Sequence, residues 1–134
     1  MIGYALFGSN DLPRSFAFYD ALFASIGVNR LMQFPTGAVC WGASWTTPML
    51  GVGPAYDGQP ATAGNGTMIA LVVDERAKVD ALYQAAMAAG GGDEGGPGVR
   101  GEEGPQAFYA AYFRDPDGNK LCAFRVGLAK ADLG

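Results

Sequence analysis

The chain has 134 residues, of which 49% are apolar and 16% are charged, with a formal net charge of −4 and no histidine. This length suits one domain with a real core, and a charged fraction below the usual ~25% argues against disorder. The acidic balance argues against nucleic acid as a partner, since nucleic-acid binding requires a basic face. It is compatible with a neutral or cationic small ligand.

The two cysteines, Cys40 and Cys122, lie far apart in the chain and show no CxxC spacing. A disulfide framework is therefore not expected, and two reduced thiols in a cytoplasmic protein are the favoured interpretation. The N-terminus has no basic segment before an apolar run, which a signal peptide would have. Because no apolar stretch reaches the roughly 18 residues of a membrane span, we also expect no membrane partner.

The first half of the chain predicts a strand, a helix and three short strands. Residues 2–9 alternate in the manner of a half-buried strand, with Tyr4 and Leu6 on one face. Apolar residues then recur at helical spacing from 11 to 27, and an Asn-Asp pair at the start of this segment can cap the helix. Turns that contain Pro, Gly and Thr separate the remaining strands. These strands are expected at 30–34, 38–43 and 49–53.

Residues 54–66 are rich in Gly, Pro, Ala and Asn and form a predicted linker, after which the pattern restarts. Residues 67–73 predict a strand, Asp74 is placed to cap a second helix, and Gly90 is placed to end it. The interval from capping residue to closing glycine is the same in both predicted helices, which indicates a duplicated βαβββ module. The second module is expected to finish with a glycine-rich connection over 91–104, strands near 108–114 and 120–126, and a tail over 128–134.

Residues 112–124 read YFRDPDGNKLCAF, which is typical of two strands joined by a tight turn. Pro116 fixes φ near about −65°, and Gly118 tolerates positive φ. This run resembles the closing hairpin of the vicinal oxygen chelate superfamily, which includes glyoxalase, bleomycin resistance and dioxygenase proteins. The segments DLPRSFAFYDALF and GNGTMIALVV are similar to the family in the same order, and the resemblance covers residues 2–126.

The resemblance implies an α+β fold of the glyoxalase/bleomycin resistance type. Two βαβββ modules, at about 1–53 and 67–127, would make a single domain over residues 1–127. Each helix would cover one face of its sheet, and the two sheets would face each other to form a cup.

Metal-dependent members of this family carry metal ligands on four inner strands. Matched by motif, these ligands would fall at Tyr4, near Gly51, at Met68 and at Cys122. None of the four is a usual ligand for a hard divalent metal, which prefers carboxylate, imidazole or amide donors. We therefore expect no metal ion and no other cofactor.

The inner faces of the cup are expected to be apolar and aromatic. Side chains of this kind also fill ordinary cores, and that alternative stays open. Cys122 is interpreted as an inert thiol, because no histidine can activate it. Arg100 borders the cup and is a candidate to hold an anionic group, whereas Lys120 is interpreted as a surface charge of the hairpin. The expected ligand-binding residues are Tyr4, Leu6, Trp41, Met68, Arg100, Tyr112 and Cys122, and no catalytic residue can be assigned.

Three functions follow from these observations. The first is metal-free binding of a small apolar or aromatic molecule in the cup. The second is a superfamily enzyme, similar to a lactoylglutathione lyase or a dioxygenase, that uses an atypical site. The third is an interaction or scaffold domain whose cup is filled by its own side chains. A homodimer is an expectation that the resemblance supplies.

Overall fold

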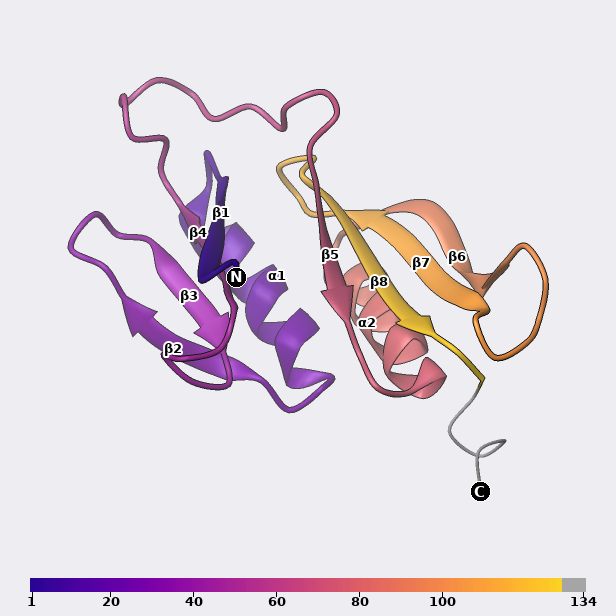
Figure 1. Ribbon diagram of the computed structural model, residues 1–134. Coiled ribbons are helices and arrows are strands. Elements are labelled where there is room, and N and C mark those ends of the chain that lie inside the picture. Colours follow the sequence, from indigo (N-terminus) through magenta and orange to yellow (C-terminus); the bar gives the residue numbers. More distant parts are fainter. Residues whose placement is uncertain (129–134) are drawn as a thin grey trace.

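Two four-stranded sheets, each covered by one helix, make up the computed structural model of the chain, which describes residues 1–128 (Figure 1). The predicted tail therefore lies outside the described residues from 129 onward. Module 1 contains β1 (Tyr4–Gly8), α1 (Leu12–Ala24), β2 (Asn29–Gln33), β3 (Val39–Gly42) and β4 (Met49–Gly53). Module 2 contains β5 (Met68–Val72), α2 (Arg76–Ala88), β6 (Gly92–Arg100), β7 (Phe108–Arg114) and β8 (Lys120–Val126).

The two sheets share one topology. Their strand orders are β1-β4-β3-β2 and β5-β8-β7-β6, and in each sheet the first and last strands of the module pair in parallel. The other pairs are antiparallel. The predicted α+β fold with two βαβββ modules is confirmed, and β1 and β5 each lie at an edge of their sheet.

The two helices begin differently. The Oδ1 atom of Asp11 accepts a hydrogen bond from the Arg14 backbone N–H at 3.2 Å, so the predicted cap of α1 is present. Helix α2 begins after Glu75, and the predicted capping residue Asp74 instead pairs with Lys78 at 2.7 Å. Neither helix of residues 1–128 is long and apolar enough to cross a membrane.

The glycine-rich segment that was expected to be a connection is a strand. Strand β6 pairs with β7 at both of its ends, and the register shifts between Asp93 and Gly95 and between Gly95 and Gly98. Glycine has a low strand propensity, which is why the pattern predicted a loop. The neighbouring β7 backbone overrides this preference by pairing with β6, and Gly95, which lies between the two register shifts, tolerates an unusual φ value. Gly95 has a φ of 142°.

A single core joins the two modules, because α1 and α2 pack against each other as well as against their own sheets. Its largest fully buried side chains include Phe18 and Trp41 from module 1 and Leu82 and Phe113 from module 2. Full burial of a large apolar side chain contributes about 1.5–3 kcal/mol, so this shared core is the main force that holds the modules together.

A buried polar cluster also joins the modules at the turn between β7 and β8. The Tyr19 hydroxyl on α1 donates to Asp115 Oδ2 at 2.7 Å, and the Asn119 side-chain amide donates to the same oxygen at 2.9 Å. The Asn119 amide also donates to the Gly8 carbonyl at 3.0 Å. Burial first, and then the Asp115 charge, raise the pKa of Tyr19, so this hydroxyl remains a donor. The turn of module 2 is thus anchored on the end of β1.

Candidate functional site

Each sheet has a face opposite its helix, which we call its open face. On β1, Phe7 points to the core, whereas Tyr4 and Leu6 lie on the open face and are more than half exposed. On β5, Met68 and Val72 lie on the open face, with exposed fractions of 43% and 72%. The strand alternation predicted from the sequence therefore holds, and both edge strands present apolar side chains to solvent.

The open face of the first sheet is closely packed beside β1. Leu6 pairs with Gly51, and Gly51 pairs with Cys40, so the three residues form a row across the sheet. A Cβ atom at Gly51 would collide with Leu6 Cδ2 and lie 2.8 Å from Cys40 Sγ. Burial raises the pKa of the Cys40 thiol. A side chain at position 51 would therefore require Leu6 and Cys40 to move.

The open face of the second sheet carries a tyrosine and a cysteine side by side. Tyr112 on β7 pairs with Cys122 on β8, and the hydroxyl interacts with the thiol. Burial is the largest cause that raises the pKa of Cys122, and it outweighs the lowering by Tyr112 and by the nearby cations. Burial also raises the pKa of Tyr112. Both groups are therefore protonated near neutral pH, as expected for an inert thiol.

Two cations lie against the Tyr112 ring. The Arg100 guanidinium carbon is 5.5 Å from the ring centroid, and the Lys120 ammonium nitrogen is 5.6 Å from it. Arg100 borders the open face as predicted. Lys120 was interpreted as a surface charge, but strand alternation places it on the same face as Cys122, two residues later. The spacing of two residues between Lys120 and Cys122 is therefore the signal in the sequence that predicts the face on which Lys120 lies.

Trp41 is not on an open face. Its side chain is 1% exposed, and the indole N–H donates to Asp20 Oδ1 on α1 at 3.0 Å. The ring lies close to Phe16 and Phe23 of the same helix. The structure therefore places Trp41 in the core, whereas five of the expected ligand-binding residues lie on the open faces: Tyr4, Leu6, Met68, Tyr112 and Cys122. Arg100 lies against Tyr112 on the second sheet.

The residues at the four positions of the metal ligands do not fit a divalent metal. Position 51 is a glycine, which offers no side-chain donor, and the Cys122 thiol is buried with a raised pKa. Tyr4 and Met68 are poor donors for a hard cation. Residues 1–128 contain no group of three His, Cys, Asp or Glu side chains that could hold a metal ion. No step of the chemistry is therefore assigned to a metal.

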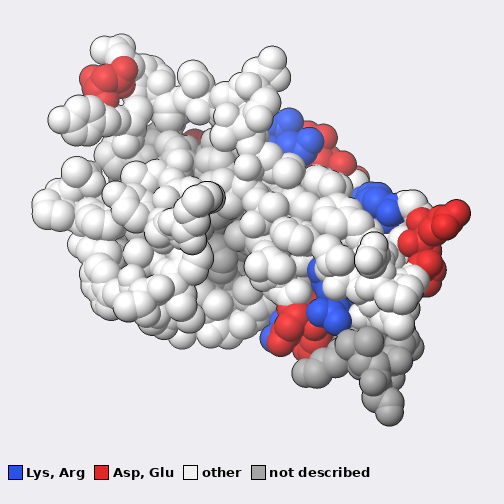
Figure 2. Space-filling model, in the orientation of Figure 1, with Lys and Arg blue, Asp and Glu red and all other residues white. Residues whose placement is uncertain are grey.

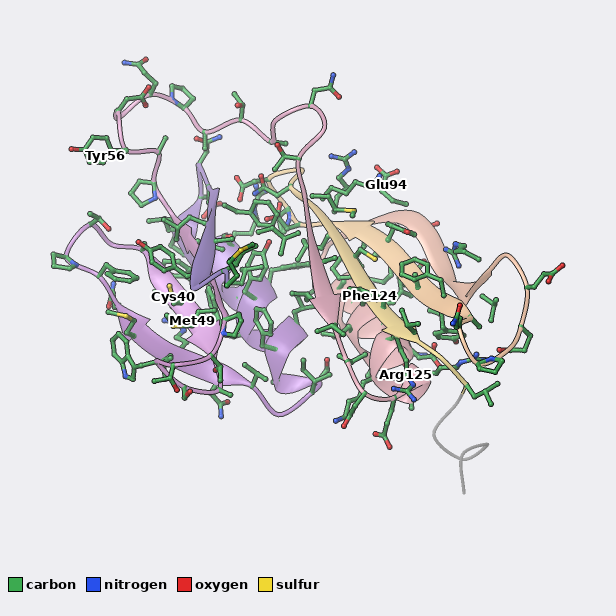
Figure 3. All side chains as sticks on the ribbon, viewed as in Figure 1. Cys40, Met49, Tyr56, Glu94, Phe124 and Arg125 are labelled. Atoms are coloured by element: carbon green, nitrogen blue, oxygen red, sulfur yellow. The ribbon has the colours of Figure 1, made fainter. Side chains whose placement is uncertain are left out.

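Two cavities adjoin the open faces. One, of about 740 Å³, lies between the linker and the end of the first sheet, with Leu6, Gly53 and Ala61 among its lining residues. The linker is held there by Asn10, whose side chain exchanges two hydrogen bonds, of 2.9 and 2.7 Å, with the Ala61 backbone. Figure 3 shows the Tyr56 side chain projecting from this linker away from the sheets. The other, of about 310 Å³, lies beside β5 and is bordered by residues that include Met68, Arg114 and Lys120.

Comparison with known proteins gives a consistent result. The family model of the Glyoxalase/Bleomycin resistance protein/Dioxygenase superfamily matches residues 1–123. A solved glyoxalase/bleomycin resistance protein from Albidiferax ferrireducens T118 is 34% identical, with 92% of this chain and 97% of that chain covered and a TM-score of 0.81. Hypothetical protein SA1046 from S. aureus is 25% identical, with 92% and 91% covered and a TM-score of 0.68.

A more distant solved structure shows the fold alone. Lactoylglutathione lyase from Agrobacterium tumefaciens is 22% identical, with 92% of each chain covered and a TM-score of 0.61. No curated protein matches the chain. The matches agree with the resemblance that the hairpin and the two other segments indicated.

Proposed function

Because the chain belongs to the Glyoxalase/Bleomycin resistance protein/Dioxygenase superfamily, we propose that it binds a small apolar or aromatic molecule without a metal, in a cup that a second copy completes. The observation that carries this proposal is the chemistry of the open faces. They present exposed apolar side chains, and the positions of the family's metal ligands hold residues that do not fit a metal.

The apolar character of these faces supports ligand binding. Tyr4, Leu6 and Met68 are all about half exposed, so a ligand that covers them removes apolar surface from water. At about 25 cal/mol per Å², covering a few half-exposed side chains of this size contributes several kcal/mol. Exposed apolar surface bordering a cavity is a usual feature of a small-molecule site.

The second copy is supported by the edges of the sheets. Within residues 1–128, strands β1 and β5 each pair on one side only, and each displays apolar side chains beside the unpaired edge. Unpaired apolar edges of this kind are normally covered in soluble proteins. In the proposed dimer, module 2 of one copy covers the open face of module 1 of the other.

The binding proposal is tested by a thermal-shift screen of apolar and aromatic compounds against purified protein, together with metal analysis of the same sample. We expect at least one compound to raise the Tm and no stoichiometric metal to be present. The variants Leu6→Ser and Met68→Ser should weaken binding of that compound. Trp45→Ser is the matched control, because Trp45 is an exposed apolar residue in the turn between β3 and β4.

Three results would contradict the proposal. The first is a screen in which no compound raises the Tm. The second is one bound metal ion per chain, with turnover of a hemithioacetal or a catechol that is lost on chelation, which would favour the enzyme alternative. The third is a light-scattering mass of a monomer at every concentration, which would contradict the proposal that a second copy completes the cup.

A further inference from the structure

The open face of the second sheet carries two cations, Arg100 and Lys120, that have no acidic partner among residues 1–128. The ion pairs of the described residues do not include Arg100 or Lys120. Their basic residues are Arg14, Arg30, Arg76, Lys78 and Arg114. This is unexpected in a chain with 13 acidic and 9 basic residues, where partners are abundant. In the view of Figure 2 the charged side chains gather over module 2, and module 1 is almost free of them.

The Arg100 side chain is held in place before any ligand arrives. It lies along its own strand, and its two Nη atoms donate to the Gly98 and Gly96 carbonyls at 2.9 Å each. A Cβ atom at Gly95 would lie 3.1 Å from Arg100 Nη2, so the glycines of β6 provide the space in which the guanidinium lies flat. A guanidinium has five N–H donors, and the remaining ones stay available for an anion.

The surroundings of the two cations suit an anion with an apolar body. Arg100 and Lys120 are half-buried, and Cys122 and the Tyr112 ring lie beside them. Charge-assisted hydrogen bonds are stronger in such partly desolvated places than in water. The carboxylate of Glu94, on the same strand as Arg100, is bound by Arg114 Nε at 2.8 Å and so does not neutralise the pair.

We propose, on the basis of the binding function above, that the ligand is an organic anion. Its carboxylate or phosphate-type group lies against Arg100 and Lys120 at the Tyr112 ring, and its apolar or aromatic body covers Met68 and, in the proposed dimer, the open face of the first sheet of the second copy. The acidic net charge of the chain favours cations on average, but the local charge of this face selects for the opposite sign.

The test compares 2-naphthoate with 2-naphthamide, which has the same shape and no charge, by calorimetric titration of the full chain. We expect the acid to bind about tenfold more tightly or better, with an advantage that shrinks at high salt. Lys120→Met should remove most of this advantage, whereas Lys120→Arg should keep it. Lys78→Met, which removes a lysine paired with Asp74, is the control and should change nothing.

The outcomes separate this inference from the proposed function. Equal binding of acid and amide overturns the anion proposal and leaves apolar binding intact. Absence of binding by either probe, or by any compound of the thermal-shift screen, counts against both. An advantage of the acid that Lys120→Met leaves unchanged also overturns the inference. Arg100→Met removes two hydrogen bonds to the backbone of β6, which could destabilise the strand. This variant is therefore titrated only if its Tm matches that of the wild type.

Discussion

The two modules repeat one sequence of elements, but they use the same turn in different ways. The turn of module 2 is buried against module 1, with Asp115 as its acceptor for Tyr19 and Asn119. The corresponding turn of module 1, from Ser44 to Thr47, is mostly exposed, and within residues 1–128 its hydrogen bonds join only its own residues. The repeat therefore gives both modules the same order of elements. The polar cluster around Asp115, which only one of the two turns has, helps to join module 2 to module 1.

The open faces of the two modules also differ from each other in chemistry. Module 1 provides a packed apolar row built around a glycine, and module 2 provides a tyrosine, a thiol and two cations. This division suits a ligand with an apolar part and a charged part, one recognised by each module. If the two modules differ in this way, matched substitutions in them should have unequal effects.

The largest effect is expected from Asp115→Ala. It removes the acceptor of the Tyr19 hydroxyl, the Asn119 amide groups and the Asp117 backbone N–H, all close to 2.9 Å or shorter. Because these donors would be left buried without partners, the free energy of unfolding should fall by about 3 kcal/mol. Ser44→Ala in the corresponding turn should change it by less than about 0.5 kcal/mol. Urea denaturation measures both, and similar losses at the two turns would contradict the comparison.

A smaller effect is expected from adding one methyl group to the sheets. Gly51→Ala places a Cβ atom against Leu6 and Cys40 and should cost about 1–3 kcal/mol of stability. Gly92→Ala in module 2 is the matched change, because its Cβ atom would lie 3.6 Å from the nearest atom, Cβ of Arg114. It should be neutral or slightly stabilising. If Gly51→Ala and Gly92→Ala change the free energy of unfolding equally, Leu6 and Cys40 are not closely packed around position 51.

The smallest effect is expected on stability at low pH. Each module has one arginine that binds a carboxylate through two hydrogen bonds, Arg30 with Asp20 and Arg76 with Glu103. The bond from Arg30 is the main cause that lowers the pKa of Asp20, and that from Arg76 lowers the pKa of Glu103 to about 2. Because both values lie below those of the unfolded chain, the stabilisation is complete above about pH 4.5 and is lost as pH falls through the folded values.

Carboxyl-carbon NMR titration checks this prediction. Glu103 should titrate with a midpoint near 2, and Arg76→Met should return it toward 4.5. Asp20 should also titrate below its ordinary value of 3.8, and its pKa should rise in Arg30→Met. A Glu103 midpoint above 4 in the wild type would show that the pair of module 2 does not form in solution.

Much of the architecture was predictable because it depends on local periodicity. The order of elements, the repeat and the faces of Tyr4, Leu6 and Met68 follow from alternation and helical spacing. Strand β6 was missed because glycine propensity favours a loop and only pairing with β7 makes it a strand. Trp41 was misplaced because its face depends on parity in a four-residue strand, where a shift of one residue reverses every side chain.

The candidate site was less predictable because its contacts join residues far apart in the chain. Strand parity alone placed Tyr112 and Cys122 on one face. The position of Arg100 against Tyr112 depends on how the side chain folds back along the glycines of β6, which no periodicity encodes. The hydrogen bond between Tyr19 and Asp115 spans 96 residues and requires both modules to be in place.

Metal-free binding at the open faces is tested most directly by a methyl-NMR titration of the protein with 2-naphthoate, recorded with and without EDTA. The methyl signals of Leu6 and Met68 are expected to shift on binding, and the Kd is expected to be the same in both samples. Loss of binding in EDTA, or shifts confined to methyl groups away from the open faces, would contradict this expectation.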